Sequence, residues 1–306
     1  MPLSRRHLLA AGTALGATAL APAALADRAT AREADGRYPV LIGPPTGPRL
    51  HIMSYNIRLD ADAPPRSWDN RRPLVRTLLQ GEQPSVLCTQ EGFFYMLQDL
   101  KADHQAYDWI HLGREGGSAG EATCVLYDRR RLSVLAYDHL WLSDTPRLIG
   151  SKNWGNDVVR MLTWVRFRDL LTDKEFYVVN NHFDHRSEPS RQKGASLNLE
   201  VASDFDAPVV VAGDFNTEPG GESHRILTEG GLVDSWDAAE ERLTEEYGTF
   251  NGWDPEPRPA PESRRIDWIL GEPGIRYHAA AVNTYSAPGG RNPSDHWPVQ
   301  ALISLP

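Results

Sequence analysis

The residues best suited to chemistry follow a short apolar stretch that begins at Pro208. Valine and alanine fill positions 209–212, Gly213 follows, and then come the carboxylate of Asp214 and the carboxamide of Asn216. The β-branched run predicts a strand that is buried on both faces, and Gly213 lets the backbone turn without a Cβ clash. Asp214 and Asn216 lie two positions apart, so an extended chain projects them to the same side. Such a pair suits a divalent metal ion or a phosphate, although it is also typical of a turn.

Several other predicted strands end in polar groups of the same kinds. These groups are hard oxygen donors, imidazoles that transfer protons near neutral pH, and carboxylates that can orient an imidazole. The oxygen donors are Asn56, Glu91, Asp214, Asn216 and Asp295; the imidazoles are His182 and His296; the orienting carboxylates are Glu121 and Asp267. Loops at the end of a rigid sheet usually hold catalytic groups. The set suits hydrolysis of a phosphate ester, in which carboxylates bind Mg²⁺, the ion polarises the phosphoryl oxygen, and imidazole–carboxylate pairs transfer protons.

The order of the motifs resembles the endonuclease/exonuclease/phosphatase superfamily, the pancreatic deoxyribonuclease-like metal-dependent phosphoesterases. The resemblance covers roughly residues 50–304, and Gly-Asp-Phe-Asn and Ser-Asp-His are its most informative parts. The six motifs are Ser54–Arg58, Thr89–Glu91, Asn181–His185, Gly213–Asn216, Arg265–Asp267 and Ser294–His296. The resemblance implies an α+β fold, a four-layer α/β/β/α sandwich in which helices flank two mixed, mainly antiparallel sheets.

The resemblance also implies roles for the oxygen donors. Asn56, Glu91 and Asp295 would form the metal side of the site, with Glu91 the principal ligand of Mg²⁺ and with Mn²⁺ or Ca²⁺ as alternatives. Asp214 and Asn216 would handle the nucleophile and the scissile phosphate. For Asn56 and Asp295, a role in a turn remains the alternative.

The two histidines receive different roles from the same resemblance. His296, oriented by Asp267, would be the general base. His182 would contact the phosphate or act as the acid, and Glu121 would align it. For Glu121, a solvated charge beside a Gly-rich loop is the alternative.

Three further positions bear on the substrate. Arg160 and His185 are candidates for substrate binding, against the alternatives of a strand-edge arginine and a surface-loop histidine. Abasic-site endonucleases of the superfamily carry a carboxylate two residues after the first asparagine, and this chain has Arg58 there. That DNA-repair activity is therefore not expected.

The elements that must position these groups follow from hydrophobic periodicity. Residues 71–80 have apolar side chains at helical spacing, with Asn70 as a plausible N-cap. Ten or so predicted strands accompany about four helices, and successive strands mostly lack a full helix between them. This pattern favours two packed mixed sheets over a doubly wound parallel sheet.

The first 26 residues are typical of an export signal. Arg5 and Arg6 precede an Ala- and Gly-rich apolar run that ends in the A-x-A sequence of positions 24–26. The arginine pair indicates the twin-arginine export machinery as a partner, and the alternative is an N-terminal membrane anchor. We expect cleavage after Ala26, a linker over 27–49, one catalytic domain over 50–306, no stable membrane span, and a periplasmic or extracellular location.

The charge of the chain bears on its partners. The formal charge is −9, and removal of Arg5 and Arg6 with the signal would make it −11. An acidic protein lacks the basic footprint of sequence-independent duplex binding, which disfavours a nuclease. The expected substrate is a phosphorylated small molecule, lipid or nucleic acid, bound by a monomer. A secreted nuclease and a non-catalytic metal- or phosphate-binding relative are the alternatives.

Both cysteines fall within apolar, strand-like runs. Cys88 and Cys124 are the whole cysteine content of the chain, and neither has the spacing of a metal site. Buried free thiols are the expected state, and a disulfide is the alternative.

Overall fold

The structure, a computed structural model, describes residues 39–306. The predicted export signal and most of the predicted linker lie outside these residues. Within the described part of the linker, the backbone N–H groups of Leu41, Ile42 and Gly43 donate to the buried carboxylate of Glu82. No helix of the described part is both long and apolar enough to cross a membrane.

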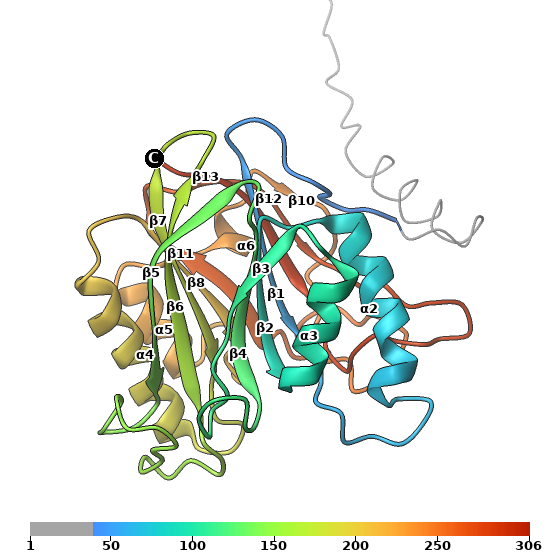
Figure 1. Ribbon diagram of the computed structural model, residues 1–306, viewed down its shortest axis with the longest axis horizontal. Coiled ribbons are helices and arrows are strands. Elements are labelled where there is room, and N and C mark those ends of the chain that lie inside the picture. The colour runs from blue at the N-terminus through green and yellow to red at the C-terminus, as the bar shows by residue number, and fades with distance from the viewer. Residues whose placement is uncertain (1–38) are drawn as a thin grey trace, which may run out of the picture. The chain divides into compact units, whose positions relative to one another are not determined.

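Residues 39–306 form two mixed sheets, as predicted (Figure 1). The seven-stranded sheet has the order β10-β12-β13-β1-β2-β4-β3 and the six-stranded sheet the order β5-β6-β7-β8-β11-β9. In the first sheet the strands are β1 (Leu50–Asn56), β2 (Val86–Gly92), β3 (Tyr107–Ile110), β4 (Ala122–Asp128), β10 (Glu241–Arg242), β12 (Arg276–Val282) and β13 (Val299–Ser304). In the second they are β5 (Leu132–Trp141), β6 (Met161–Asp169), β7 (Glu175–His182), β8 (Val209–Asp214), β9 (Val233–Asp234) and β11 (Asp267–Gly271).

Helices cover the outer face of each sheet, which gives the four predicted layers. The helices are α2 (Trp68–Glu82), α3 (Phe94–Asp103), α4 (Glu188–Ser203), α5 (Glu222–Glu229) and the short α6 (Ser235–Ala238). Helices α2 and α3 pack on the first sheet, and α4 and α5 pack on the second (Figure 1). The capping prediction is wrong, because α2 begins after Ser67 and Asn70 only donates its side-chain amide to the Ser67 hydroxyl.

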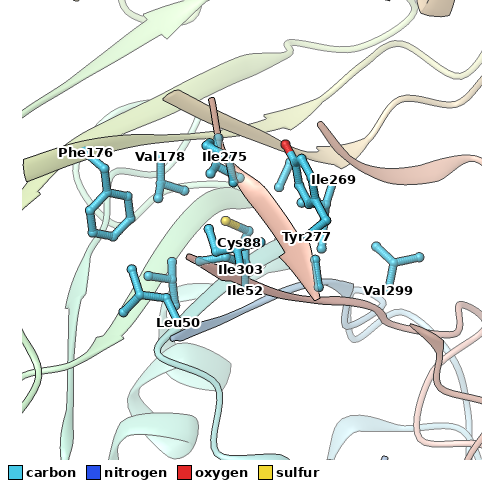
Figure 2. Packing of buried hydrophobic residues seen from close by; sticks show 14 of the residues in the cluster. Leu50, Ile52, Cys88, Phe176, Val178, Ile269, Ile275, Tyr277, Val299 and Ile303 are labelled. Carbon is cyan, nitrogen blue, oxygen red and sulfur yellow. The ribbon is translucent and has the colours of Figure 1, made fainter. Parts of the chain in front are cut away.

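Strand β8 shows how the alternation of side chains builds the layers. Val210 and Ala212 face the core between the sheets, whereas Val209 and Val211 pack beneath the helices of the second sheet. The inter-sheet core also takes Leu50, Ile52 and Cys88 from the first sheet and Phe176 and Val178 from the second (Figure 2). Cys88 and Cys124 are buried and free.

Of the three parallel strand pairs in the described sheets, β10 with β12 lies at a sheet edge, and the other two lie inside the largely antiparallel sheets. β1 and β2 are parallel and joined through α2, and β7 and β8 are parallel and joined through α4. Because the carboxyl ends of parallel neighbours meet at one edge, polar residues after these strands gather there. At Gly213 the φ angle is 152° and an added Cβ would lie 2.3 Å from the Asn181 carbonyl oxygen, so the close pairing of β7 with β8 requires glycine.

Candidate active site

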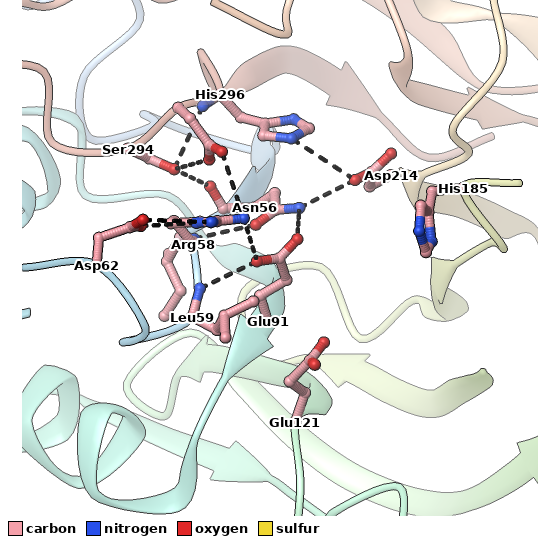
Figure 3. A network of polar contacts seen from close by, with 12 residues as sticks. Asn56, Arg58, Leu59, Asp62, Glu91, Glu121, His185, Asp214, Ser294 and His296 are labelled. Atoms are coloured by element: carbon pink, nitrogen blue, oxygen red, sulfur yellow. Dashed lines mark hydrogen bonds and ion pairs between the residues drawn. The ribbon is translucent and has the colours of Figure 1, made fainter. Parts of the chain in front are cut away.

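The functional side chains converge where the two sheets meet at the carboxyl ends of the parallel pairs (Figure 3). The Asn56 amide at the end of β1 donates to Glu91 Oε1 and to Asp214 Oδ2, each over 2.9 Å. The second bond crosses from one sheet to the other. Below it, Gln90 donates to Asn180 Oδ1 over 2.7 Å, which ties the sheets together in the buried interior. These amide bridges fix the two halves of the site relative to each other.

Asn56 turns its amide nitrogen, rather than its oxygen, toward the carboxylates. Its Oδ1 atom accepts the backbone N–H of Arg58 over 3.0 Å. Glu91, at a φ of 64°, is held further by the backbone N–H of Leu59, which donates to Oε2 over 3.0 Å. Asn56 therefore positions Glu91 and Asp214, and its role as a metal ligand stays a prediction.

Asp267 and His296 form a buried hydrogen-bonded pair. His296 Nδ1 lies 2.9 Å from Asp267 Oδ2. An ionised carboxylate only accepts hydrogen bonds, so Nδ1 donates and His296 Nε2 faces Asp214 Oδ2 at 3.9 Å. This is the arrangement in which a carboxylate orients an imidazole for proton transfer.

The second histidine has an arginine as its partner. Arg160 Nη1 lies 2.8 Å from His182 Nδ1, and a guanidinium only donates. His182 Nδ1 is therefore the acceptor and Nε2 carries the proton, 3.5 Å from Asp214 Oδ2. Burial, followed by the charge of Arg160, holds the pKa of His182 well below its usual range. A neutral His182 is thus a hydrogen-bond donor at Nε2.

Glu121 lies beside the arginines of the site. Its carboxylate is 2.8 Å from Arg114 Nη2 and 3.9 Å from Arg160 Nη1. Its influence on His182 therefore passes through Arg160. Arg160 also reaches His185, whose Nδ1 lies 3.3 Å from Nη2 at the more exposed rim.

Asn216 and Asp295 complete the predicted set. Asn216, at a φ of 52°, donates its side-chain amide to the Phe183 carbonyl and its backbone N–H to Asp214 Oδ1. Asp295 lies 3.6 Å from the guanidinium of Arg58. All the predicted site residues therefore lie in or around one site, with Asn216 and His185 toward its rim.

Negative charge is concentrated in this buried site. Burial, together with the charge of Asp267, raises the pKa of Asp214 to about 7. Burial alone would lower the pKa of His296, but the charges of Asp267 and Asp214 outweigh it and raise that pKa to about 10. Both shifts show an environment that favours additional positive charge.

The donor atoms fit a divalent cation. The side-chain ligand atoms of Glu91, His182 and Asp214 lie within 4.8 Å of one another, and so do those of Asp214, Asp267 and His296. Asp267 Oδ1 is buried without a hydrogen-bond partner among the described residues. Carboxylate oxygens are the ligands that Mg²⁺ prefers, so the site can hold such an ion with Glu91 and Asp214 as its oxygen donors.

The two raised pKa values predict how the chelator-treated protein responds to pH. The Asp214 contribution to stability is present below about pH 4 and is lost as the pH rises through about 7. The His296 contribution is present below about pH 6.5 and is lost as the pH rises through about 10. Thermal denaturation in chelator should therefore show falling stability from pH 7 to 10, by a few kcal/mol at about 1.4 kcal/mol per pKa unit.

The variant His296→Gln provides the control for this titration. It lacks the group that titrates, so its stability should fall less than that of the wild type between pH 7 and 10. Equal slopes for the two proteins would contradict the assignment.

Sequence motifs did not reveal two residues that build the His296 side of the site. The buried Thr249 hydroxyl accepts the backbone N–H groups of Ile266 and Asp267, over 2.9 and 3.1 Å, and the Thr249 carbonyl accepts the Trp297 N–H. Thr249 thereby ties together the chain segments that carry Asp267 and His296. The neighbouring Phe250 is 40% exposed, with its ring centroid 5.2 Å from that of His296. Both lie in a Pro- and Gly-rich loop whose sequence indicates only a surface segment.

Comparison with known proteins identifies the family to which this site belongs. The model of the Endonuclease/Exonuclease/phosphatase family matches residues 53–296. The chain belongs to this family. The family's solved structures include a protein from Bacteroides thetaiotaomicron that is 30% identical, with a TM-score of 0.78 over 85% of this chain and 99% of that one.

Two further proteins show what the similarity covers. A mannosyl-6-phosphatase from Bacteroides thetaiotaomicron is 30% identical, with a TM-score of 0.77 over 84% of this chain and 100% of that one. An uncharacterised protein of Acanthamoeba polyphaga mimivirus is 30% identical over 161 residues, which are 49% of this chain. The match to the viral protein covers 60% of that protein's length. A separate match, to an exoribonuclease subunit from Aspergillus niger, covers 40% of the length of that subunit. Family membership makes hydrolysis of phosphate esters the expected chemistry.

Proposed function

We propose that the protein is an exported, divalent-metal-dependent hydrolase of phosphate esters, with phosphorylated sugars as its substrate class. The observation that carries the reaction type is the convergence of Glu91, Asp214 and the Asp267–His296 pair in one buried site. The sugar is proposed from the similarity to the mannosyl-6-phosphatase. The net charge of −9 also favours a small substrate over a polynucleotide.

In the proposed reaction each side chain has a task that its geometry supports. A divalent ion at Glu91 and Asp214 would lower the pKa of His296, which the carboxylates of the metal-free site raise to about 10. The neutral Nε2 atom would then accept the proton of the attacking water, because Nδ1 is engaged with Asp267. Asp214 lies 3.9 Å from His296 Nε2 and accepts a hydrogen bond from the same water. His182 donates its Nε2–H to a phosphoryl oxygen, because Arg160 occupies Nδ1. Glu91 and Asp214 would hold a divalent ion, which would supply polarisation of the phosphoryl oxygen and offset the carboxylate charge.

A panel of phosphoesters tests the proposal. Mannose 6-phosphate, glucose 6-phosphate, bis-p-nitrophenyl phosphate and a single-stranded oligonucleotide would be incubated with the protein and Mg²⁺, Mn²⁺ or Ca²⁺. We expect release of inorganic phosphate from the sugar phosphates, its loss in chelator and its recovery with Mg²⁺.

Two results of the panel would favour the other classes. Faster cleavage of the oligonucleotide than of the sugar phosphates would indicate a nuclease. Tight metal binding without turnover of any compound would indicate a non-catalytic relative.

Export is proposed from the sequence of residues 1–26 alone. The paired Arg5 and Arg6 and the following apolar run support the twin-arginine route to the periplasm or the exterior. N-terminal sequencing of protein recovered outside the cytoplasm should begin at Asp27. Recovery of the chain only from the cytoplasm would contradict the proposal.

A further inference from the structure

The guanidinium of Arg58 lies among carboxylates on the metal side of the site. Its Nη1 atom is 3.9 Å from Glu91 Oε2 (Figure 3) and 3.6 Å from Asp295 Oδ2. On its outer side Nε lies 2.9 Å from Asp62 Oδ2. Three protein carboxylates therefore balance the positive charge of Arg58.

The backbone conformation of Arg58 determines where its side chain lies. Arg58 has a φ of 57°, in the left-handed region that side-chain-bearing residues seldom adopt. Its N–H donates to Asn56 Oδ1, and its carbonyl accepts Arg71 Nη2 over 2.8 Å. Arg71 is buried and also binds the Ile57 carbonyl. The turn after β1 is thus built to direct Arg58 toward Glu91 and Asp295.

Asp295 stands apart from the candidate metal ligands. Neither group of residues whose ligand atoms gather within 4.8 Å includes Asp295. The sequence predicts Asp295 as a metal ligand, but its Oδ2 atom faces Arg58. A divalent ion beside Asp295 would therefore have a fixed positive charge for a neighbour, which repels it strongly in a buried site.

We propose that Arg58 takes the place of a second cation between Glu91 and Asp295, so that this site binds one divalent ion. The inference rests on the proposed function in one respect, namely that the site binds a divalent ion. It identifies Arg58 as the residue that sets the number of ions.

Titration of the full chain with Mn²⁺ tests this proposal without measuring turnover. Electron paramagnetic resonance of free Mn²⁺ and titration calorimetry give the number of bound ions. We expect one ion per chain in the wild type and two in Arg58→Asn, the second bound more weakly, because asparagine tolerates a positive φ and removes the charge. Arg66→Asn is the matched control, since Arg66 lies in the same loop and stacks on Trp253; it should bind one ion.

The outcomes separate this inference from the proposed function. Two ions in the wild type, or a single ion in a folded Arg58→Asn, would overturn the role of Arg58 and leave metal-dependent hydrolysis standing. The variant Arg58→Gly, which also suits the positive φ, repeats the measurement if the asparagine variant melts early. No bound Mn²⁺ in any of the proteins would overturn the proposed function itself.

Discussion

The variant His296→Gln is expected to lower kcat by about 10²- to 10⁴-fold, the usual contribution of a positioned general base. His296 is buried, its Nδ1 atom is bound to Asp267, and its Nε2 atom faces Asp214. Glutamine keeps a polar side chain of similar length but cannot accept and release a proton at this position. Initial rates on the best substrate of the panel give the measurement, with KM expected to change much less than kcat.

A matched histidine and a double variant complete this experiment. His278 lies on β12, where Nε2 contacts the Ser304 hydroxyl at 2.9 Å, outside the site; His278→Gln should retain wild-type kcat. Asp267→Asn should also lower kcat, and combining it with His296→Gln should add little, because residues that act as a unit are not additive. The assignment would be contradicted if the kcat loss of the double variant equalled the product of the two single losses. It would also be contradicted if His296→Gln kept the wild-type kcat.

The sequence predicted the fold from its strand periodicity together with a resemblance. The continuous apolar run of residues 209–212 indicates a strand that is buried on both faces, and the absence of full helices between most strands favours packed sheets. Strand β8 does face both a sheet and a helix layer, as such a strand should. The sequence places Glu91 and Asp214 at the ends of two predicted strands, whereas their meeting in one site was expected from the resemblance, because β2 and β8 belong to different sheets. The strand positions depend on local sequence, and the meeting depends on the fold of the family.

The side-chain partners inside the site could not be predicted in the same way. The sequence gives no indication that His182 binds Arg160 rather than Glu121, because the choice depends on how the residues just before β6 and β4 are placed in the folded chain. The positive φ of Arg58 likewise has no glycine or asparagine to mark it. Thr249 acts through a loop with no motif. Long-range packing, rather than local pattern, decides all three.

The variant Glu91→Gln is expected to weaken Mg²⁺ binding by more than about 100-fold and to abolish metal-dependent turnover. Loss of a group that merely supports a metal ligand costs about 10- to 100-fold in metal affinity, and Glu91 is a proposed direct ligand. Glutamine can keep the contact with Asn56 through its oxygen but has lost the charge that attracts the cation. Calorimetric titration with Mg²⁺ and rates at saturating substrate give the two measurements.

The matched control for this variant is Glu121→Gln. Glu121 is as buried as Glu91, each side chain being 12% exposed, but its carboxylate is neutralised by Arg114 at 2.8 Å. Its replacement should change the Mg²⁺ affinity far less than Glu91→Gln does. If the two variants lost the same affinity, the effect would reflect the general negative charge of the site, and Glu91 would not be the ligand. A difference of two orders of magnitude would place the ion at the carboxyl ends of β2 and β8, where Asn56 joins Glu91 to Asp214.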